Sequence, residues 1–352
     1  MNILYGVSGE GFGHSSRALV VIKFLESNGH RVKILTYGKA FEVLKDKFDC
    51  IEIHGLHLAL EQGQVKKGKT VLNNLLNFPR NFIKIRKLNR FMKNFRPDIC
   101  ISDFEPLSCM ISLSYGLPLI SIGNHQILTK TKTNIQKPSK HYPDYLLVKT
   151  ITYCLSPHAD FYIITSFLET LKKTKNSFLV APIIREDVRN LKPCEKDKIL
   201  VYLYANQSSD LFNMLKKVNQ KFVIYGMNIT KKDENLEFKT KESFLEDLGE
   251  CKAIIAHGGF SLISEAIYLK KPYFAIPQKG QFEQTFNALS LAKYKFGKFS
   301  ENINQKNISE FLANLEEYKM NLNNYNCNCN YDEVYMTLDK ILKHIEIRNI
   351  SK

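Results

Sequence analysis

The chain has 352 residues, of which 44% are hydrophobic and 24% are charged, and its formal net charge is +15. This balance is typical of a globular protein and excludes a disordered chain. At about 100–200 residues per domain, the length favours two domains. No apolar stretch reaches the roughly 18 residues of a membrane-spanning helix, so we expect any membrane contact to be peripheral. The positive charge leaves phosphates, nucleic acid and an anionic membrane open as partners.

The N-terminus leads directly into a strand and a glycine-rich loop, and we expect no signal peptide. Several of the eight cysteines lie inside apolar runs and no CxxC pair occurs, which favours reduced thiols and a cytoplasmic protein. The pairs Cys327/Cys329 and His54/His57 lack the further ligands of a zinc site. We therefore predict no metal and no cofactor.

Short apolar runs alternate with helical patterns in the N-terminal half. A helix is predicted over 15–28, because apolar residues recur there at a spacing of 3.6. Buried strands are predicted at 1–7, 31–36, 98–102, 118–122 and 161–165. This alternation indicates an α/β fold, with a parallel sheet covered by helices on both faces.

The same alternation restarts after the polar stretch 185–198, which we interpret as a linker. Further strands are predicted at 199–203, 222–225, 253–256 and 273–276, then a loop over 321–330 and a helix over 332–347. We predict two doubly wound domains, 1–187 and 196–330, and leave open whether a helix at 331–352 packs back on the first. Ligands of such folds bind outside the carboxyl ends of the strands, so two facing domains would form a cleft.

A glycine-rich loop, with Gly9, Gly11 and Gly13, follows the first predicted strand. Its spacing is not that of a dinucleotide-binding loop, and no acidic residue ends the second strand, which disfavours a nicotinamide cofactor. His14 ends the loop. A neutral imidazole there could take a proton from an acceptor hydroxyl near pH 7, and the alternative is a loop or capping histidine.

Asp103 follows the strand 98–102 and is expected at the same sheet edge as His14. It could orient the imidazole as a carboxylate does in a catalytic triad. The alternative is an N-cap for a helix that begins near Pro106. Glu105 is a weaker candidate as base or partner.

The segment from His257 to Ala266 reads HGGFSLISEA and follows the predicted strand 253–256. Free N–H groups at a helix start can bind a diphosphate, and Ser261 adds a hydroxyl. Glu265 lies one turn further on the same face, where its carboxylate could accept both ribose hydroxyls. The alternatives are a tight turn for the glycines and an ordinary solvated glutamate.

The pattern His-Gly-Gly…Ser-Glu-Ala…Pro…Pro…Glu-Gln…Asn-Ala, from His257 to Ala288, resembles the donor-site signature of one group of glycosyltransferases. These are related to the UDP-glucuronosyltransferases and the peptidoglycan N-acetylglucosaminyltransferase. Gly11-Phe-Gly-His14 resembles their acceptor-side loop, and residues 102–106 and 280–284 resemble an uncharacterised microbial branch of the group. One motif lies in each predicted domain, so the resemblance covers nearly the whole chain.

The resemblance implies a GT-B fold, with two Rossmann-like domains facing across a cleft, the first on the acceptor side and the second binding the donor. It also implies inverting, metal-independent transfer of a sugar from a nucleotide-sugar, UDP-linked by default, to a hydroxyl acceptor. His14 and Asp103 would be catalytic. The substrate-binding candidates are Gly11, Gly13, Arg17, Glu105, His257, Gly258, Gly259, Ser261, Glu265, Gln281, Glu283, Gln284 and Asn287.

Individual roles follow from the same resemblance. The diphosphate would be held by Gly258, Gly259 and Ser261, and approached by Gly13. Glu265 would bind the ribose. Glu283 and Gln284 would bind sugar hydroxyls, with Asn287 supporting that loop. Two departures stand out: relatives often carry Asp at the position of Glu283 and Gly at that of Lys271.

Residues 66–96 contain ten basic side chains and no acidic one, and Leu, Ile and Phe are interleaved among them. This pattern is typical of a basic amphipathic helix on an anionic membrane, and equally of a core helix with a solvated basic face. The membrane interpretation places the protein at the inner face of the cytoplasmic membrane, with a lipid-linked acceptor or a cell-envelope glycan.

Three other functions remain open at this stage. The first is a nucleotide-sugar hydrolase or a 2-epimerase of the same fold. The second is a non-enzymatic nucleic-acid-binding protein, which only the charge suggests and which we do not expect. The third is a non-catalytic sensor of sugar nucleotides.

Overall fold

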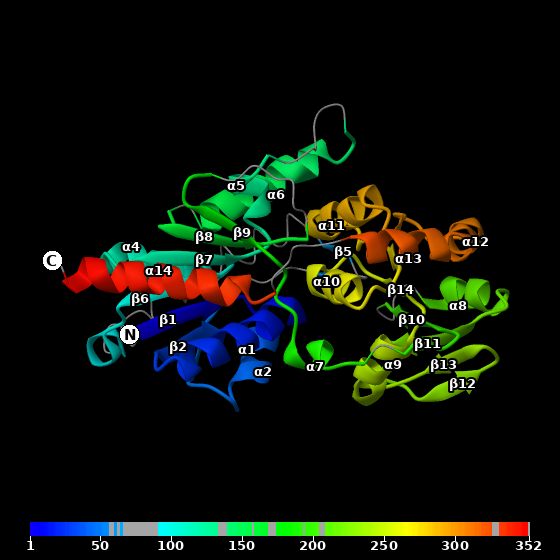
Figure 1. Cartoon of the computed structure of the whole chain (residues 1–352), viewed down its shortest axis with the longest axis horizontal. Helices are drawn as coiled ribbons and strands as arrows, with labels where there is room; N and C mark the ends of the chain where they lie inside the picture. Colours follow the sequence, from blue (N-terminus) through cyan, green and yellow to red (C-terminus); the bar gives the residue numbers. More distant parts are fainter. Residues whose placement is uncertain are drawn as a thin grey trace. The chain divides into compact units, whose positions relative to one another are not determined.

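The computed structural model describes residues 1–55, 60–61, 64–65, 91–132, 139–156, 158–167, 174–192, 194–203, 208–325 and 331–350. The chain divides into two compact units, each built on a seven-stranded sheet with helices (Figure 1). Unit 1 comprises 1–59, 66–183 and 327–352, and unit 2 comprises 60–65 and 184–326. The predicted α/β class with two Rossmann-like sheets is confirmed.

The sheet of unit 1 has the order β3-β2-β1-β6-β7-β8-β9, and all its strands are parallel. Its strands are β1 (Asn2–Val7), β2 (Arg31–Thr36), β3 (Cys50–Glu52), β6 (Ile99–Asp103), β7 (Leu119–Gly123), β8 (Phe161–Thr165) and β9 (Ser177–Val180). Its helices are α1 (Phe12–Ser27), α2 (Gly38–Leu44), α4 (Pro106–Tyr115), α5 (Ile127–Lys130), α6 (Tyr142–Leu155) and α14 (Glu333–Ile350). The strand order reverses between β1 and β6, and ligands of doubly wound sheets bind at such a switch point.

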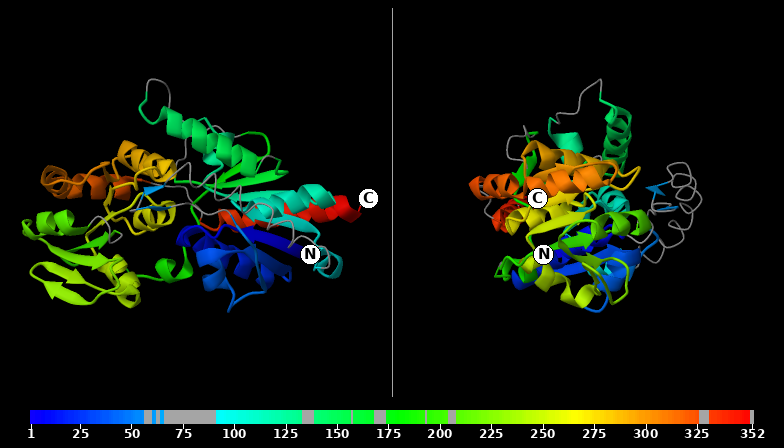
Figure 2. Two further views of the ribbon diagram at one scale, coloured as in Figure 1. Left: turned by 180° about the vertical axis from the view of Figure 1, so that it is seen from behind. Right: turned by 90° about the vertical axis from the view of Figure 1, so that its right-hand side faces the viewer.

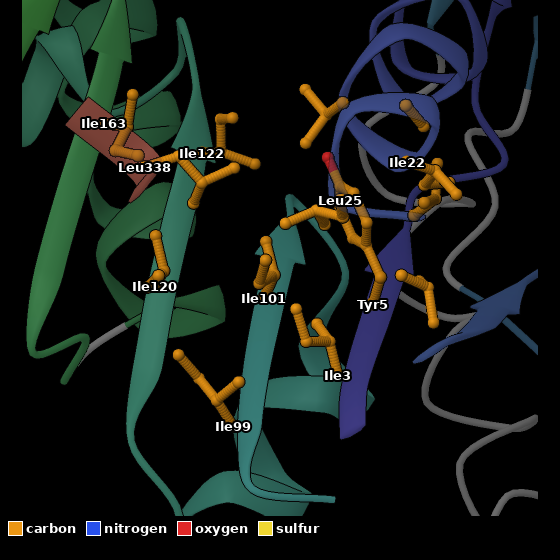
Figure 3. Close-up of a cluster of buried hydrophobic side chains, with 14 of the residues drawn as sticks. Ile3, Tyr5, Ile22, Leu25, Ile99, Ile101, Ile120, Ile122, Ile163 and Leu338 are labelled. Atoms are coloured by element: carbon orange, nitrogen blue, oxygen red, sulfur yellow. The ribbon is translucent and has the colours of Figure 1, made fainter. Parts of the chain in front are cut away.

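One face of this sheet is covered by the first and the last helix of the chain. Buried side chains of α1 and α14 pack on alternate residues of the central strands, such as Ile3 and Tyr5 (Figure 3). Leu338 of α14 lies against Ile122 and Ile163 in the same view. The C-terminal helix, drawn in red, runs beside the strands of this sheet (Figure 2). Residues far apart in sequence therefore share one core.

The opposite face receives α4. The intervening residue of β1 on that face is Gly6, where a Cβ atom would overlap the side chains of Ser108 and Glu105. The absence of a side chain at Gly6 lets α4 approach the sheet closely. Helices on both faces bury this parallel sheet, as the continuous apolar strands require.

The sheet of unit 2 has the order β12-β13-β11-β10-β14-β15-β16, in which only the β12–β13 pair is antiparallel. The strands are β10 (Lys198–Tyr202), β11 (Lys221–Tyr225), β12 (Lys231–Asp233), β13 (Leu236–Phe238), β14 (Ala253–Ala256), β15 (Tyr273–Ala275) and β16 (Gly297–Phe299). The helices are α7 (Glu186–Arg189), α8 (Ser208–Lys216), the short η2 (Lys241–Ser243), α9 (Phe244–Glu250), α10 (Phe260–Tyr268), α11 (Phe282–Lys293), α12 (Gln305–Ala313) and α13 (Leu315–Asn324). A separate short pair joins β4 (Leu60–Glu61) to β5 (Gln64–Val65). The order of the large sheet reverses between β10 and β14.

Some expectations need correction and others fall outside the described residues. The predicted loop 321–330 begins too early, because α13 continues to Asn324. The predicted linker 185–198 contains α7, and β10 already begins at Lys198. Most of the basic segment and the Cys327/Cys329 pair lie outside the described residues. Within the described ranges, no helix has the length and apolar character needed to cross a membrane.

Candidate functional site

The N-terminal candidates gather at the switch point of the first sheet. Asp103 is the last residue of β6, and Val7, its partner in β1, leads into the glycine loop. Gly11 caps α1 with a φ of 79°, a left-handed conformation that favours glycine. Gly13 and His14 lie in the first turn of α1 and Arg17 one turn later. The end of β6 thus meets the start of α1.

His14 and Arg17 both contact the carboxylate of Asp103. The distance from His14 Nδ1 to Asp103 Oδ1 is 2.7 Å, and Arg17 donates to both carboxylate oxygens, at 2.7 Å from Nε and 2.5 Å from Nη2. Asp103 is completely buried. Burial alone would raise its pKa, but the Arg17 guanidinium and His14 outweigh this and lower the pKa of Asp103 to about 2.

These contacts determine which nitrogen of His14 carries the proton. An ionised Asp103 only accepts hydrogen bonds, so His14 Nδ1 must carry the hydrogen that it donates to Oδ1. Arg17 Nη2 lies 3.1 Å from the same nitrogen, but a guanidinium has no lone pair, so this is a close approach between donors. The lone pair of the neutral ring therefore resides on Nε2. That nitrogen is the one available to accept a proton.

The protonation equilibrium of His14 favours the neutral ring. Burial lowers the pKa of His14 below its ordinary 6.5, and the attraction of Asp103 opposes this shift without cancelling it. The side chain keeps 12% of its surface exposed. A neutral imidazole oriented by a carboxylate is a suitable general base near pH 7.

Two rings beside His14 were not identified from the sequence. The His125 ring stacks against His14 at a centroid distance of 5.4 Å and against Phe104 at 4.0 Å. Phe104 has a φ of 55°, an uncommon conformation for an aromatic residue, and it directly follows Asp103. The available signal was weak: His125 belongs to a Gly-Asn-His stretch after β7. The ring stack limits the orientations open to the His14 imidazole.

The carboxylate of Glu105 caps the helix that follows it, α4. It is the N-cap of α4, and its carboxylate accepts hydrogen bonds of 2.7 Å from the backbone N–H groups of Leu107 and Ser108. Burial raises the pKa of Glu105 to about 7 although these donors oppose the rise. The N-cap of this helix is therefore Glu105 and not Asp103, which was the alternative role considered for Asp103. Asp103 instead contacts His14 and Arg17.

In unit 2 the glycine turn lies between β14 and α10. His257 follows β14, and its Nδ1 lies 3.0 Å from the carbonyl oxygen of Ile276, which can only accept. Gly259 is the N-cap of α10, and Ser261 lies in the first turn. The first backbone N–H groups of an α-helix have no partner within the helix, and such groups can bind an anion.

The two glycines of this turn have different surroundings, which allows a matched test. A Cβ atom on Gly258 would overlap the backbone carbonyl of Gln284, whereas one on Gly259 would have nothing within 4 Å. We expect Gly258→Ala to lower the free energy of unfolding by about 1–3 kcal/mol, as overpacking does. Gly259→Ala should lower it less, because its Cβ atom meets open space and only the N-cap preference for glycine over alanine is lost. Urea unfolding of both variants checks this, and equal stabilities would contradict the close packing.

The loop before α11 is held together by amide side chains. Gln284 accepts a hydrogen bond from the backbone N–H of Gln278 at 2.9 Å and donates to the side chains of Gln278 at 3.1 Å and Gln281 at 3.0 Å. Asn287 donates to the carbonyl of Gly258 at 3.1 Å and so connects α11 to the glycine turn. Glu283 lies in the first turn of α11. The amide of Gln284 is thus engaged by the loop itself.

Glu265 forms an ion pair that the sequence did not predict. Arg185 donates to both of its carboxylate oxygens, at 2.7 Å from Nε and 3.0 Å from Nη2. The side chain of Glu265 is 6% exposed and that of Arg185 is 29% exposed. Residue 185 begins the stretch interpreted as a linker, so a residue outside the recognised motif reaches the motif's carboxylate.

Among the described residues, no three His, Cys, Asp or Glu side chains are grouped in a way that could hold a metal ion. The second histidine of the pair His54/His57, from which no metal site was predicted, lies outside those residues. The candidates therefore form one cluster in each unit. His14, Arg17 and Asp103 meet in unit 1, and the glycine turn, Asn287 and the glutamine loop meet in unit 2.

Comparisons with known proteins agree with this arrangement. The family model described as Glycosyl transferase family 1 matches residues 1–316. An uncharacterized glycosyltransferase of Methanosarcina acetivorans is 24% identical over 326 residues, which cover 85% of each chain. The crystal structure of the glycosyltransferase VinC in complex with dTDP is similar with a TM-score of 0.66 at 13% identity, covering 98% of this chain and 100% of VinC.

The spinosyn rhamnosyltransferase SpnG, complexed with spinosyn aglycone, has a TM-score of 0.63 at 12% identity, with 96% and 100% of the two chains covered. Similarity at such low sequence identity shows the fold alone. The family model, which matches residues 1–316, shows the family. The two Rossmann-like sheets match the architecture of these glycosyltransferases. The chain belongs to glycosyl transferase family 1 and is a glycosyltransferase with the GT-B fold.

Proposed function

We propose that the protein transfers a sugar from a nucleotide-sugar donor to a hydroxyl acceptor with inversion at the anomeric carbon and without a metal. The observation that carries this proposal is the 2.7 Å contact between His14 Nδ1 and the ionised, buried Asp103. It leaves Nε2 as a base beside a switch point where ligands of this fold bind. Residues 1–187 form the acceptor-side domain of the proposal and 196–330 the donor domain.

The chemistry is a single displacement. Nε2 of His14 takes the proton of the acceptor hydroxyl as its oxygen forms a bond to the anomeric carbon. The bond between that carbon and the diphosphate oxygen breaks, and the nucleoside diphosphate leaves with the electron pair. Asp103 stabilises the imidazolium that forms, which is the role of the carboxylate in a triad.

The donor binds to unit 2 in this proposal. N–H groups at the start of α10 and the hydroxyl of Ser261 receive the diphosphate, because a helix N-terminus favours negative charge. Glu265 accepts the ribose hydroxyls. Glu283, Gln281 and His257 face the sugar, and Gln284 shapes their loop through its three hydrogen bonds. UDP is the first nucleotide to test, and dTDP the second, because VinC was crystallised with it.

A thermal-shift panel of UDP, dTDP, GDP, ADP and CDP, each with its common sugar conjugates, tests the donor site. A ligand present at 100 times its Kd stabilises the native state by about 2.7 kcal/mol. When all ligands are tested at the same concentration, the true donor, which has the lowest Kd, should therefore raise Tm most. Glu265→Gln should abolish the selective shift, whereas Glu316→Gln, on an exposed side chain, should preserve it. No shift with any nucleotide would contradict the proposal.

The reaction type needs a second measurement. The best donor is incubated with the enzyme alone and then with alcohol acceptors, and free sugar, epimer and glycoside are quantified. Glycoside that forms only with an acceptor supports transfer. Rapid turnover of the donor alone would instead identify a hydrolase or an epimerase.

The proposal also includes binding of the protein to a membrane on the acceptor side. The basic segment 66–96 binds anionic lipid at the inner face of the cytoplasmic membrane, where it meets a lipid-linked or envelope-glycan acceptor. Each basic residue near such a surface contributes about 1 kcal/mol. Sedimentation with phosphatidylglycerol vesicles, compared with phosphatidylcholine vesicles at low and high salt, tests this. Equal binding to both would contradict it.

A further inference from the structure

The segment that begins unit 2 packs along α10, the helix whose N-terminus receives the diphosphate in the proposed function. Arg185 is the N-cap of α7 and pairs with Glu265 of α10 through two hydrogen bonds. One turn further along both helices, the Tyr268 hydroxyl donates to the carbonyl of Arg189 at 3.5 Å. Positions 265 and 268 lie on one face of α10, because residues three apart are neighbours on a helix. The two helices therefore meet at two successive points.

The geometry of the pair leaves Glu265 able to bind a ligand. A carboxylate has about four lone-pair positions, two on each oxygen. Arg185 takes one position on Oε1 through Nε and one on Oε2 through Nη2. One lone pair therefore remains on each oxygen, which matches the two hydroxyls of a ribose.

The planar fork of an arginine also fixes the plane of the carboxylate that it binds. Glu265 is nearly buried, and a buried charge is costly unless it is paired. The ion pair supplies the countercharge and holds the carboxylate in one orientation. A positioned acceptor loses less conformational freedom when it binds a ligand than a mobile one does.

We infer that Arg185 is a positioning residue of the donor site, which acts through Glu265 to present both carboxylate oxygens to the ribose hydroxyls of the nucleotide. This inference rests on the proposed function, because it assigns a partner to the carboxylate that binds the ribose. It adds the segment before β10 to the donor site. The recognised motif alone would not include a residue 80 positions away.

The experiment compares a nucleotide with its own analogue that lacks the ribose hydroxyls. Kd is measured by calorimetry for the nucleoside diphosphate that stabilises the wild type most and for its 2′,3′-dideoxy counterpart. Arg185→Gln should weaken binding of the parent nucleotide by about 10- to 100-fold, since charge-assisted hydrogen bonds contribute about 1.5–3 kcal/mol. Binding of the dideoxy analogue should not change. Arg185→Lys should restore part of the difference, because lysine offers a charge without the fork.

Controls separate a positioning role from a structural one. Arg189→Gln makes the same change in charge on the same helix at an exposed position and should alter neither Kd. Glu265→Gln should remove the preference for the parent nucleotide, and Arg185→Gln should have no further effect in that background. If Arg185→Gln alone is too unstable to study, Arg185→Lys and the double variant carry the same comparison.

The outcomes are distinguishable. If the wild type binds no nucleotide, the proposed function itself is wrong. If the wild type binds nucleotide but does not distinguish the dideoxy analogue, Glu265 does not bind the ribose and the inference about Arg185 fails. An equal loss for both ligands would assign Arg185 a purely structural role, and tighter binding by Arg185→Gln would show that Arg185 competes with the ribose.

Discussion

Replacing His14 with glutamine is expected to reduce kcat by about 10²- to 10⁴-fold, which is the contribution of a positioned general base. Glutamine retains a polar side chain of similar size but cannot take a proton from the acceptor hydroxyl. The nucleoside diphosphate binds to the other unit in the proposed mechanism, so its Kd should not change. Steady-state kinetics with the identified donor and acceptor, together with calorimetry, measure both quantities.

The pH dependence gives an independent test of the same residue. The base must be neutral to act, and burial lowers the pKa of His14 below 6.5. Activity should therefore be maximal at neutral pH and fall as pH decreases through that lowered pKa, with the acidic limb absent in His14→Gln.

His158→Gln removes an exposed histidine and should leave both the rate and the profile unchanged. Full activity of His14→Gln would exclude His14 as the base. Loss of nucleotide binding in that variant would instead assign His14 to the donor.

The meeting of His14 and Asp103 could be predicted because both follow strands of a parallel sheet. The carboxyl ends of such strands share one edge, and motif spacing alone locates them there. The interaction of Arg17 with Asp103 could not be predicted in the same way. The resemblance implied a substrate contact for Arg17, whereas in the structure its guanidinium binds Asp103.

Two other contacts between distant positions could not be predicted from the sequence. His125 reaches His14 because β7 is the next strand to β6, and this adjacency follows from the sheet order and not from a motif. Arg185 reaches Glu265 across 80 positions, from a polar stretch whose composition indicated only a linker.

The edge strands β12 and β16 and the neighbouring strand β13 have three residues each, too few for a hydrophobic period to appear. Longer strands such as β2, over Arg31–Thr36, agree with the predicted range 31–36.

Replacing Asp103 with asparagine is expected to impair both catalysis and stability. Arg17 is 6% exposed, and a buried arginine that loses the carboxylate it is paired with typically costs about 3–5 kcal/mol. Catalysis should fall by about 10²- to 10⁴-fold, because a neutral amide neither fixes the tautomer of His14 nor stabilises its imidazolium. Asp98→Asn, the same substitution on an exposed residue of the same segment, serves as the matched control.

The stability effect should depend on pH with a defined sign. The pKa of Asp103 is lowered from 3.8 to about 2 in the folded state, so its ionisation stabilises the protein above pH 3.8. A shift of this size corresponds to about 2 kcal/mol, which is lost progressively as pH falls from about 5 through the folded pKa. Urea unfolding at neutral pH and near pH 3 should show the difference between wild type and Asp103→Asn shrinking in acid. A constant difference would mean that Asp103 is not the ionised partner of Arg17.

A double variant separates the two roles of Asp103. Replacing Arg17 with methionine in the Asp103→Asn background removes the buried charge, and substituting both members of a buried pair is often neutral or stabilising. Stability should therefore return toward that of the wild type, while kcat stays low because His14 still lacks its carboxylate. If both recover together, Asp103 supports activity only by keeping the protein folded. If stability recovers and activity does not, the carboxylate acts on the chemistry through the imidazole of His14.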